Sequence, residues 1–227
     1  MIQLKSVRKE YRLGKNKVQA LSNINLEIPD GDFVSVVGSS GCGKSTLLLA
    51  MGGMLTPTEG EVRVNGQSLY DLSAENRARV RREQFGFVFQ TFNLIPYLTA
   101  RENIEVPLFL EGVSEKEQKQ RTEVLLERLD LSERMDHKPF EMSVGQQQRV
   151  ALARMLANDP KTILADEPTA NLDPETAETV MGFLKDLNRE GRTVVLVTHS
   201  PEAAKLARRV VRLKEGRLAS DGLTESN

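Results

Sequence analysis

The sequence of 227 residues contains a single cysteine, Cys42, and this scarcity excludes two kinds of site. One thiol cannot form a disulfide within the chain, and it cannot supply a cysteine-based zinc centre. Long apolar stretches are missing too, because no run reaches about 18 residues and residues 1–10 carry charges where a signal peptide would be apolar. We therefore expect a protein of a reducing cytoplasm that meets a membrane only through a partner.

An excess of charge of either sign is also absent, since 31 lysine and arginine residues are balanced by 32 aspartate and glutamate residues. The net charge of −1 argues against a basic nucleic-acid binder, and a hydrophobic content of 39% argues against a disordered chain. A chain of this length can bury the core of one α/β domain, or of a core with a small inserted lobe.

Short apolar runs rich in β-branched residues predict buried strands. They lie at residues 32–38, 85–89, 162–165 and 193–198, and little chain follows a last run at 210–213. Helical patterns occur at residues 44–54 and 174–189, the second with Asp173 as N-cap and Pro174 at its first position. This alternation predicts an α/β fold with a mainly parallel core sheet covered by helices on both faces.

Two stretches depart from the alternation. Residues 18–28 and 60–66 have the pattern of antiparallel strands, which predicts a small second β layer. Residues 91–154 are helical in pattern, with capping-box spacing at Thr99/Glu102 and Ser114/Glu117. We interpret residues 1–227 as one domain, in which 1–90 and 155–227 form the core and 91–154 form an inserted helical subdomain.

A phosphate-binding loop is the strongest motif in the sequence. Residues 38–45 match the pattern Gly-x-x-x-x-Gly-Lys-Ser, and they lie between a predicted strand and a predicted helix, as that pattern requires. Glycines let the backbone N–H groups turn toward phosphate oxygens, and the start of a helix favours negative charge. Lys44 is predicted to reach the β- and γ-phosphates of a nucleotide, and the Ser45 hydroxyl to bind Mg²⁺.

Two acidic residues, Asp166 and Glu167, follow the predicted strand at 162–165. Ligands of α/β proteins bind at the carboxyl edge of the sheet, and successive strand residues point to opposite sides. The pattern therefore predicts that Asp166 faces Mg²⁺ and that Glu167 is a general base for the attacking water. His199 follows the strand at 193–198 and is predicted at the same edge, where a lone histidine is usually a capping or surface residue.

The order of these motifs along nearly the whole chain resembles the nucleotide-binding domain of ABC transporters, which are P-loop ATPases. Residues 38–46 resemble the Walker A motif, Gln90 resembles the Q-loop glutamine, and residues 142–146 resemble the signature motif. Further along, residues 163–167 are similar to Walker B, residues 170–173 to the D-loop, and His199 to the switch histidine.

This resemblance implies the residues of the site. The catalytic residues it implies are Lys44, Gln90, Glu167 and His199, and the ligands of Mg²⁺ are Ser45, Gln90 and Asp166. The nucleotide-binding residues it implies are Tyr11, Val18, Gly38, Ser39, Ser40, Gly41, Cys42, Gly43, Lys44, Ser45, Thr46, Gln90, Ser143, Gly145, Gln146 and Asp173. Tyr11 is the expected adenine-stacking aromatic, with an ordinary surface tyrosine as the competing interpretation.

In this family two subunits close head to tail around two ATP molecules, and each site pairs the Walker motifs of one chain with the signature of the other. The resemblance therefore implies an ATPase that dimerises with itself, in which Ser143 and the N–H of Gly145 bind the γ-phosphate across the interface. The usual signature, Leu-Ser-Gly-Gly-Gln, is changed here at Met142 and Val144. Val144 is tolerable only if its backbone is helical and its side chain points away from phosphate.

Residues 92–107 and 145–154 resemble most closely the lipoprotein-releasing, macrolide-exporter and cell-division group, named LolD, MacB and FtsE. The resemblance implies a subunit at the cytoplasmic face of the inner membrane, which uses ATP and Mg²⁺ to power a separate permease resembling LolC/E, MacB or FtsX. Motion would pass to the permease through a groove beside Gln90 and residues 92–98, which have a competing interpretation as lobe core.

Two other functions stay open. One is an FtsE-like regulator of cell division that signals through its membrane partner without transport. The other is an ABC ATPase of DNA repair or of the ribosome, for which we would expect a coiled-coil insertion, a second cassette or zinc-binding cysteines. The sequence has none of these three features, so we expect the transport function instead.

Overall fold

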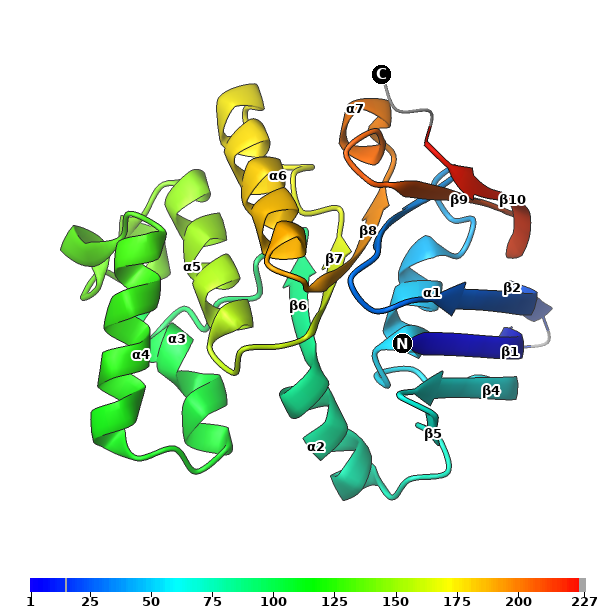
Figure 1. Cartoon of the computed structure of the whole chain (residues 1–227), viewed down its shortest axis with the longest axis horizontal. Coiled ribbons are helices and arrows are strands. Elements are labelled where there is room, and N and C mark those ends of the chain that lie inside the picture. The colour runs from blue at the N-terminus through cyan, green and yellow to red at the C-terminus, as the bar shows by residue number, and fades with distance from the viewer. Residues whose placement is uncertain (15, 225–227) are drawn as a thin grey trace.

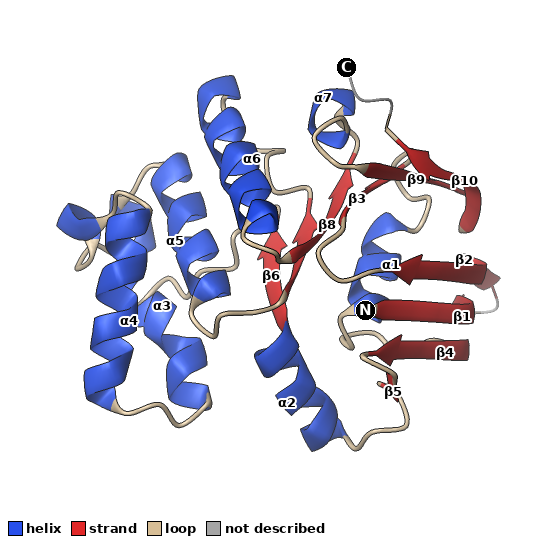
Figure 2. Ribbon diagram, in the orientation of Figure 1, coloured by secondary structure: helices blue, strands red, loops and turns tan. Residues whose placement is uncertain are grey.

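The computed structural model describes residues 1–14 and 16–224, and within them the strands form two sheets (Figures 1 and 2). The larger sheet has the spatial order β10 (Arg217–Leu223), β9 (Arg209–Lys214), β3 (Phe33–Val37), β8 (Thr193–Thr198), β7 (Thr162–Asp166) and β6 (Phe85–Phe89). All neighbours in it are parallel except β9 and β10. The smaller sheet is antiparallel, with the order β2 (Asn16–Ile28), β1 (Ile2–Leu13), β4 (Glu59–Val64) and β5 (Gln67–Ser68).

The helices follow the strands along the chain, and none of those described is both long enough and apolar enough to cross a membrane. They are α1 (Lys44–Met51), α2 (Ala74–Gln84), α3 (Ala100–Leu110), α4 (Glu115–Arg128), α5 (Val144–Leu156), α6 (Pro174–Arg189) and α7 (Pro201–Ala204), with 3₁₀ turns η1 (Ser132–Arg134) and η2 (Pro139–Glu141). The predicted fold class, with a mainly parallel sheet, a small antiparallel layer and an inserted helical lobe, is confirmed.

Two hydrophobic cores lie on opposite faces of the larger sheet. Alternate residues of each strand point to opposite faces, so that Phe33 and Val194 enter one core while Val34 and Val195 enter the other. We call the first the lobe-side core, because α3, α4, α5 and α6 pack in it. The second, the layer-side core, holds α1 between the larger sheet and the antiparallel layer. Burial on both faces explains why these strands are continuous apolar runs in the sequence.

Helices α3, α4 and α5 pack together into a helical lobe beside β6 (Figure 1). Of the two predicted capping boxes, the one at Thr99/Glu102 is complete and the one at Ser114/Glu117 is reduced to its N-cap. The Thr99 hydroxyl accepts from the N–H of Glu102 and the Ser114 hydroxyl from that of Glu117. At Thr99 the Glu102 carboxylate also accepts from the Thr99 N–H at 2.7 Å, which completes a capping box.

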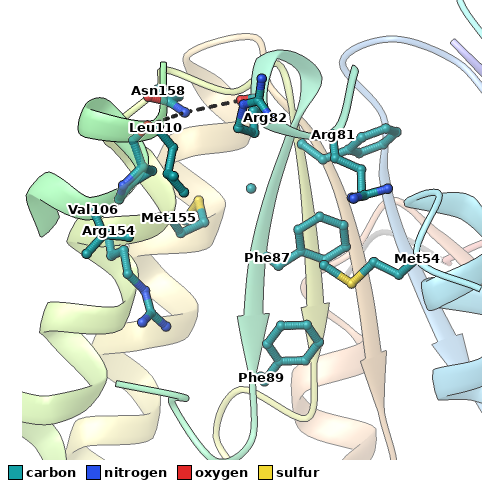
Figure 3. A pocket seen from close by; sticks show the side chains of 13 residues that line it. Met54, Arg81, Arg82, Phe87, Phe89, Val106, Leu110, Arg154, Met155 and Asn158 are labelled. Atoms are coloured by element: carbon teal, nitrogen blue, oxygen red, sulfur yellow. Dashed lines mark hydrogen bonds between the residues drawn. The ribbon is translucent and has the colours of Figure 1, made fainter. Parts of the chain in front are cut away.

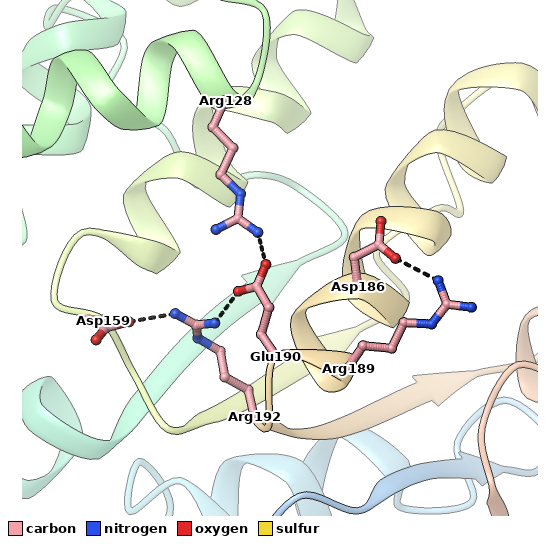
Figure 4. Close-up of polar contacts among 6 residues, drawn as sticks. All are labelled: Arg128, Asp159, Asp186, Arg189, Glu190 and Arg192. Carbon is pink, nitrogen blue, oxygen red and sulfur yellow. Dashed lines mark hydrogen bonds and ion pairs between the residues drawn. The ribbon is translucent and has the colours of Figure 1, made fainter.

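A chain of ion pairs ties this lobe to the segment between α6 and β8 (Figure 4). Arg128 of α4 pairs with the carboxylate of Glu190, which also accepts from Arg192 at 2.5 Å. The other arm of Arg192 reaches Asp159 at 2.5 Å. The Arg128 guanidinium lies 5.2 Å from the ring centre of Phe183, so that it packs as well as pairs.

One predicted helix differs in extent, and several elements were not predicted. Helix α1 ends at Met51, not at residue 54, because Gly53 turns left-handed with φ of 71° after Gly52. Strands β1 and β5 and helices α2 and α7 were not predicted. Strand β10 was also missed, and it lies in the short stretch of chain that follows residue 213.

Candidate functional site

The phosphate loop, residues 38–43, joins the end of β3 to the start of α1. Gly43 has a left-handed backbone with φ of 106°, which other residues rarely adopt. A Cβ atom on Gly43 would overlap the carbonyl oxygen of Ala20, and one on Gly38 would overlap that of Leu213. Packing against β2 and β9 therefore requires glycine at these places. Of the other predicted nucleotide-binding residues here, the exposed ones are Ser39, Ser40 and Gly41, and the half-buried one is Thr46.

Lys44 is the first residue of α1, and it is buried within the loop. Its Nζ donates to the carbonyl oxygens of Gly38 at 2.9 Å and Ser39 at 3.2 Å. Ser45, the next residue, is exposed, whereas the side chain of Cys42, two residues before Lys44, is buried in the layer-side core. The loop thus offers a cation and a hydroxyl to a ligand, while the thiol contributes packing.

Asp166 is the last residue of β7, and it is half-buried near the loop. Burial raises the pKa of its carboxyl above the ordinary value, and Glu167 acts in the same direction, while the nearby Ser45 hydroxyl and the charge of Lys44 oppose them. Its Oδ1 atom is buried and has no hydrogen-bond partner among the described residues. A buried carboxylate oxygen left in this state, beside a hydroxyl, fits a divalent cation with oxygen ligands.

Glu167 and His199 form a pair where β7 and β8 end. Nδ1 of His199 lies 2.9 Å from Oε2 of Glu167, which also accepts from the His199 N–H at 3.3 Å. Strand alternation was expected to turn Glu167 away from Asp166, but β7 ends at Asp166 and Glu167 has a left-handed φ of 49°. A hydrogen bond from its N–H to the carbonyl oxygen of Val197 holds this turn, so that the turn and not the pleat directs the side chain.

Gln90 follows β6 directly and is exposed. Its carbonyl oxygen accepts from Nδ2 of Asn171 at 3.2 Å, which connects it to the loop before α6. In that loop Asp173 is the N-cap of α6, as predicted, and accepts from the N–H and the hydroxyl of Thr176 at 3.0 and 2.6 Å. These hydrogen bonds lower the pKa of Asp173. Asn171 was not singled out from the sequence, because its contact joins positions 81 residues apart.

The signature residues lie at the start of α5, where Ser143 is the N-cap. Its hydroxyl accepts from the N–H of Gln146 at 3.2 Å, and the Gln146 side chain accepts from the N–H of Ser143 at 3.0 Å. Val144 is the first helical residue, and 48% of its surface is exposed. Its backbone is therefore helical, as the sequence argument required. A Cβ atom on Gly145 would lie 3.0 Å from the side chain of Thr176, so that α5 and α6 begin close together.

Tyr11 and Val18 face each other as a register pair of β1 and β2. Both side chains are exposed, by 37% and 46%, and Nζ of Lys9 lies 5.2 Å from the Tyr11 ring centre. Two residues beyond Val18 on the same strand, Ala20 touches the phosphate loop at Gly43. An accessible aromatic ring and an apolar neighbour thus lie on the strand pair that borders the loop.

A groove of about 290 Å³ lies between β6, α3 and α5 (Figure 3). Phe87 and Phe89 of β6 stack on one side of it, with ring centres 5.9 Å apart. Leu110, at the end of α3, lines it and is 60% exposed. The other lining residues are Met54, Arg81, Arg82, Phe85, Gly86, Val106, Pro107, Arg154, Met155 and Asn158.

The predicted residues gather into two regions. Lys44, Ser45, Asp166, Glu167 and His199 follow the neighbouring strands β3, β7 and β8, and we call them the core-side site. Residues 143–146, which we call the signature end, belong to α5. Helix α5 packs in the lobe-side core and α1 in the layer-side core, so that the chain does not bring the two regions together on one face of the sheet.

Comparisons with known proteins agree with this geometry. The profile of the family described as ABC transporter matches residues 21–170. An uncharacterized ABC transporter ATP-binding protein of Methanocaldococcus jannaschii, MJ0796, is 49% identical over 95% of this chain and 94% of its own length. The macrolide export ATP-binding/permease protein MacB of Marinobacter nauticus is 44% identical over 97% of this chain but only 34% of its own length.

A solved structure is similar over its full length. It is a dimeric, post-hydrolysis state of the ATP-binding cassette MJ0796 bound to ADP and Pi. Its TM-score is 0.93 and its identity is 44%, with both chains covered completely. The similarity extends over both the core-side site and the signature end.

Proposed function

The chain belongs to the ABC transporter family and is an ATP-binding and ATP-hydrolysing subunit, and on that premise we propose that it powers a separate membrane permease that exports its substrate. The similarity to MacB, whose name joins macrolide export to a permease, supports export as the work done. The relatives described above give no support for the cell-division alternative. We propose residues 91–154 as the subdomain that faces the permease and residues 1–90 and 155–227 as the catalytic core.

In the proposed site, ATP binds with its phosphates in the loop of residues 38–46. Lys44 supplies the positive charge to the β- and γ-phosphates, since its ammonium already lies among carbonyl oxygens of the loop. Tyr11 and Val18 provide the surface for the adenine, supported by their exposure beside the loop. Stacking needs no base-specific hydrogen bond, so selectivity for the base should be loose.

Ser45, Asp166 and Gln90 are the residues that would hold Mg²⁺, whose charge would offset that of the phosphates. The observation that carries this proposal is the buried Oδ1 atom of Asp166, which has no partner among the described residues. The raised pKa of Asp166 is what a carboxyl shows when its buried charge is only partly compensated.

Glu167 is the proposed general base, which takes the proton of the water that attacks the γ-phosphate. Its contact with His199 at 2.9 Å supports a role for the histidine in holding that carboxylate in place. Both side chains sit at the carboxyl ends of neighbouring strands, where α/β proteins hold their ligands.

We propose that the signature end completes the site of a second copy of this chain. Ser143, the N–H of Gly145 and Gln146 would meet the γ-phosphate held by the partner subunit, with Asp173 close by at the start of α6. The first N–H groups of a helix lack partners within the helix and attract anions. The dimeric state of the similar cassette supports this arrangement.

The groove beside β6 is the proposed contact with the permease, which would keep the chain at the cytoplasmic face of the membrane. Its stacked phenylalanines and the exposed Leu110 are suited to an apolar helix of a partner. Phe109, the residue before Leu110, is exposed by 71% and adds apolar surface at this end of α3.

Affinity purification of the tagged chain from native membranes, followed by mass spectrometry, tests the proposal. We expect an integral membrane protein to copurify with the wild type and to be lost from Leu110→Asp, which alters the groove. Leu223→Asp is the matched control, because Leu223 is 73% exposed on β10 and lies outside the groove. Retention of the membrane protein by Leu110→Asp, or equal loss from both variants, would contradict the proposed contact.

A further inference from the structure

The loop of residues 90–99 connects β6 to α3 and begins with Gln90, directly after the groove residue Phe89. The groove was predicted beside Gln90 and residues 92–98, but none of these residues lines it. Phe92 and Asn93, two adjacent residues with side chains, both have left-handed backbones with φ of 57° and 51°. Asparagine adopts this conformation comparatively readily, but it is sterically unfavourable for a bulky residue such as Phe92 and persists there only where the surroundings enforce it. Something must therefore hold this turn.

The turn has hydrogen bonds of its own, among them one from the Thr91 hydroxyl to Oδ1 of Asn93 at 2.9 Å. Arg154, on the last turn of α5, joins the turn to that helix. Its Nη2 donates to the carbonyl oxygen of Phe92 and its Nη1 to that of Asn93, both at 2.7 Å. The planar guanidinium suits two parallel hydrogen bonds of this kind. Arg154 forms no ion pair with a carboxylate among the described residues. Its positive charge is instead compensated by hydrogen bonds to these two carbonyl oxygens. Burial lowers the pKa of Arg154, in agreement with a cation held away from water.

Other side chains fix the rest of the loop to other elements. Asn103 of α3 donates to the carbonyl oxygens of Ile95, Leu98 and Thr99 and accepts from the N–H of Ile95. Asn171 holds the carbonyl oxygen of Gln90 from the side of α6. Arg154 is thus the side chain through which α5 holds this loop, and it does so at the turn itself.

Helix α5 carries the signature end at its start and Arg154 three turns later. The step from Ser143 to Arg154 spans about 16 Å at the usual rise of 1.5 Å per residue. A helix packed in the lobe-side core moves as a unit, because its neighbours are close-packed. Displacement of the loop at the groove is therefore transmitted by Arg154 to Ser143.

We infer that Arg154 is a positioning residue for ATP hydrolysis, which fixes the Gln90 loop to the helix of the signature end so that the two move together. The inference rests on the proposed function, because it needs the signature end to act on the γ-phosphate of a second subunit. The side chain lines the groove but touches no nucleotide in this proposal. It acts by setting where Gln90 and Ser143 lie relative to each other.

Arg154→Gln tests the inference. Glutamine keeps part of the polarity and length of arginine, but it loses the positive charge and the pair of parallel N–H donors. We expect turnover of ATP to fall about tenfold, since small misplacements of site residues carry costs of this order or larger. ATP affinity of the single subunit should stay within about twofold, because the core-side site is intact. In a Glu167→Gln background, which accumulates the ATP-bound dimer, half-maximal dimerisation on gel filtration should need about tenfold more subunit.

Arg149→Gln is the matched control on the same helix. Arg149 also donates to a backbone carbonyl oxygen, that of Leu129 at 3.2 Å, and pairs with Asp130 at 3.1 Å, but both partners lie within the lobe. We expect the melting temperature to fall comparably in the two variants, while turnover and dimerisation stay within about twofold of wild type for Arg149→Gln. Arg154→Lys keeps the positive charge but not the pair of parallel N–H donors, so its turnover and dimerisation should lie between those of wild type and Arg154→Gln.

Unchanged turnover and dimerisation in Arg154→Gln would overturn the inference, and so would an equal loss in Arg149→Gln. Wild-type turnover and ATP-dependent dimerisation, measured in the same assays, report separately on the proposed function. A loss confined to Arg154→Gln, with single-subunit ATP binding retained, supports the positioning role.

Discussion

The core-side site and the signature end are built in different ways. In the core-side site, the ends of three neighbouring strands hold charged groups in a buried or half-buried state, such as Lys44 and Asp166, and Oδ1 of Asp166 has no hydrogen-bond partner among the described residues. At the signature end, Ser143 and Gln146 satisfy each other across the first turn of α5. The core-side site therefore has polar groups that a nucleotide and a cation would pair with. At the signature end, the side chains of Ser143 and Gln146 are already hydrogen-bonded without a ligand.

This difference predicts that the two regions act at different steps. Binding and chemistry should depend on the core-side site of a single chain, and the signature end should matter only when two chains meet. Variants in the two regions should then fail in separate assays, the first in binding or turnover and the second in dimerisation.

Glu167→Gln should have the largest effect, because glutamine cannot accept the proton of the attacking water. Turnover should fall by roughly 10²-fold or more, while ATP binding persists. The variant should accumulate as an ATP-bound dimer on gel filtration, which would show that the signature end still works when chemistry is blocked. Glu117→Gln, an exposed glutamate of α4, is the control and should turn over normally. Near-normal turnover of Glu167→Gln would exclude it as the base.

Lys44→Ala should act before chemistry, at the binding of ATP by one chain. A hydrogen bond from a charged group contributes about 1.5–3 kcal/mol, so we expect affinity to fall by roughly 10- to 100-fold or more. Titration calorimetry with the wild type, Lys44→Ala and the exposed Lys116→Ala measures this directly. Undiminished binding by Lys44→Ala would contradict the role of the phosphate loop.

Ser143→Ala should separate the two regions most cleanly. We expect single-subunit ATP affinity to be unchanged, while dimerisation in a Glu167→Gln background needs about tenfold more subunit because one hydrogen bond to phosphate is lost. Loss of the N-cap should lower the free energy of unfolding by about 1 kcal/mol. Ser114→Ala removes an equivalent cap from α4 and should lower stability without affecting dimerisation. A matching dimerisation defect in Ser114→Ala would mean that capping alone explains the result.

Val144→Gly should have the smallest effect. The side chain is half-exposed at the first helical position, so we expect dimerisation within about twofold of wild type and a stability loss of at most about 1 kcal/mol. The measurement is the same gel-filtration titration. Dimerisation that becomes many times tighter would show that the valine obstructs the contact between subunits.

The sequence predicted those parts of the fold whose pattern is local and regular. Buried parallel strands are continuous apolar runs, and their positions agree with β3, β6, β7 and β8. Strand β1 was not predicted because a bulge at Ser6, with φ of 50°, interrupts the alternation of apolar and polar residues between Leu4 and Val7. Helix α2 buries no residue, so it has no apolar stripe to detect. Strand β10 is an edge strand that is almost wholly exposed.

The same distinction applies to the site. Residues of contiguous motifs could be named from the sequence, and their roles stay predictions that the variants above test. Arg154, Asn103 and Asn171 hold the Gln90 loop through contacts that exist only in the folded chain. Spacing along the sequence carries no information about such contacts, because a hydrogen bond to a backbone carbonyl oxygen requires no particular residue type there.

The left-handed backbone of Glu167 has a consequence for which residues this position tolerates. A residue with a Cβ atom gives up about 1–2 kcal/mol in that conformation, which glycine would recover. Glycine, however, has no carboxylate to meet His199. Selection for folding and selection for activity therefore oppose each other here, and the position is one where a more stable protein would be a less active one.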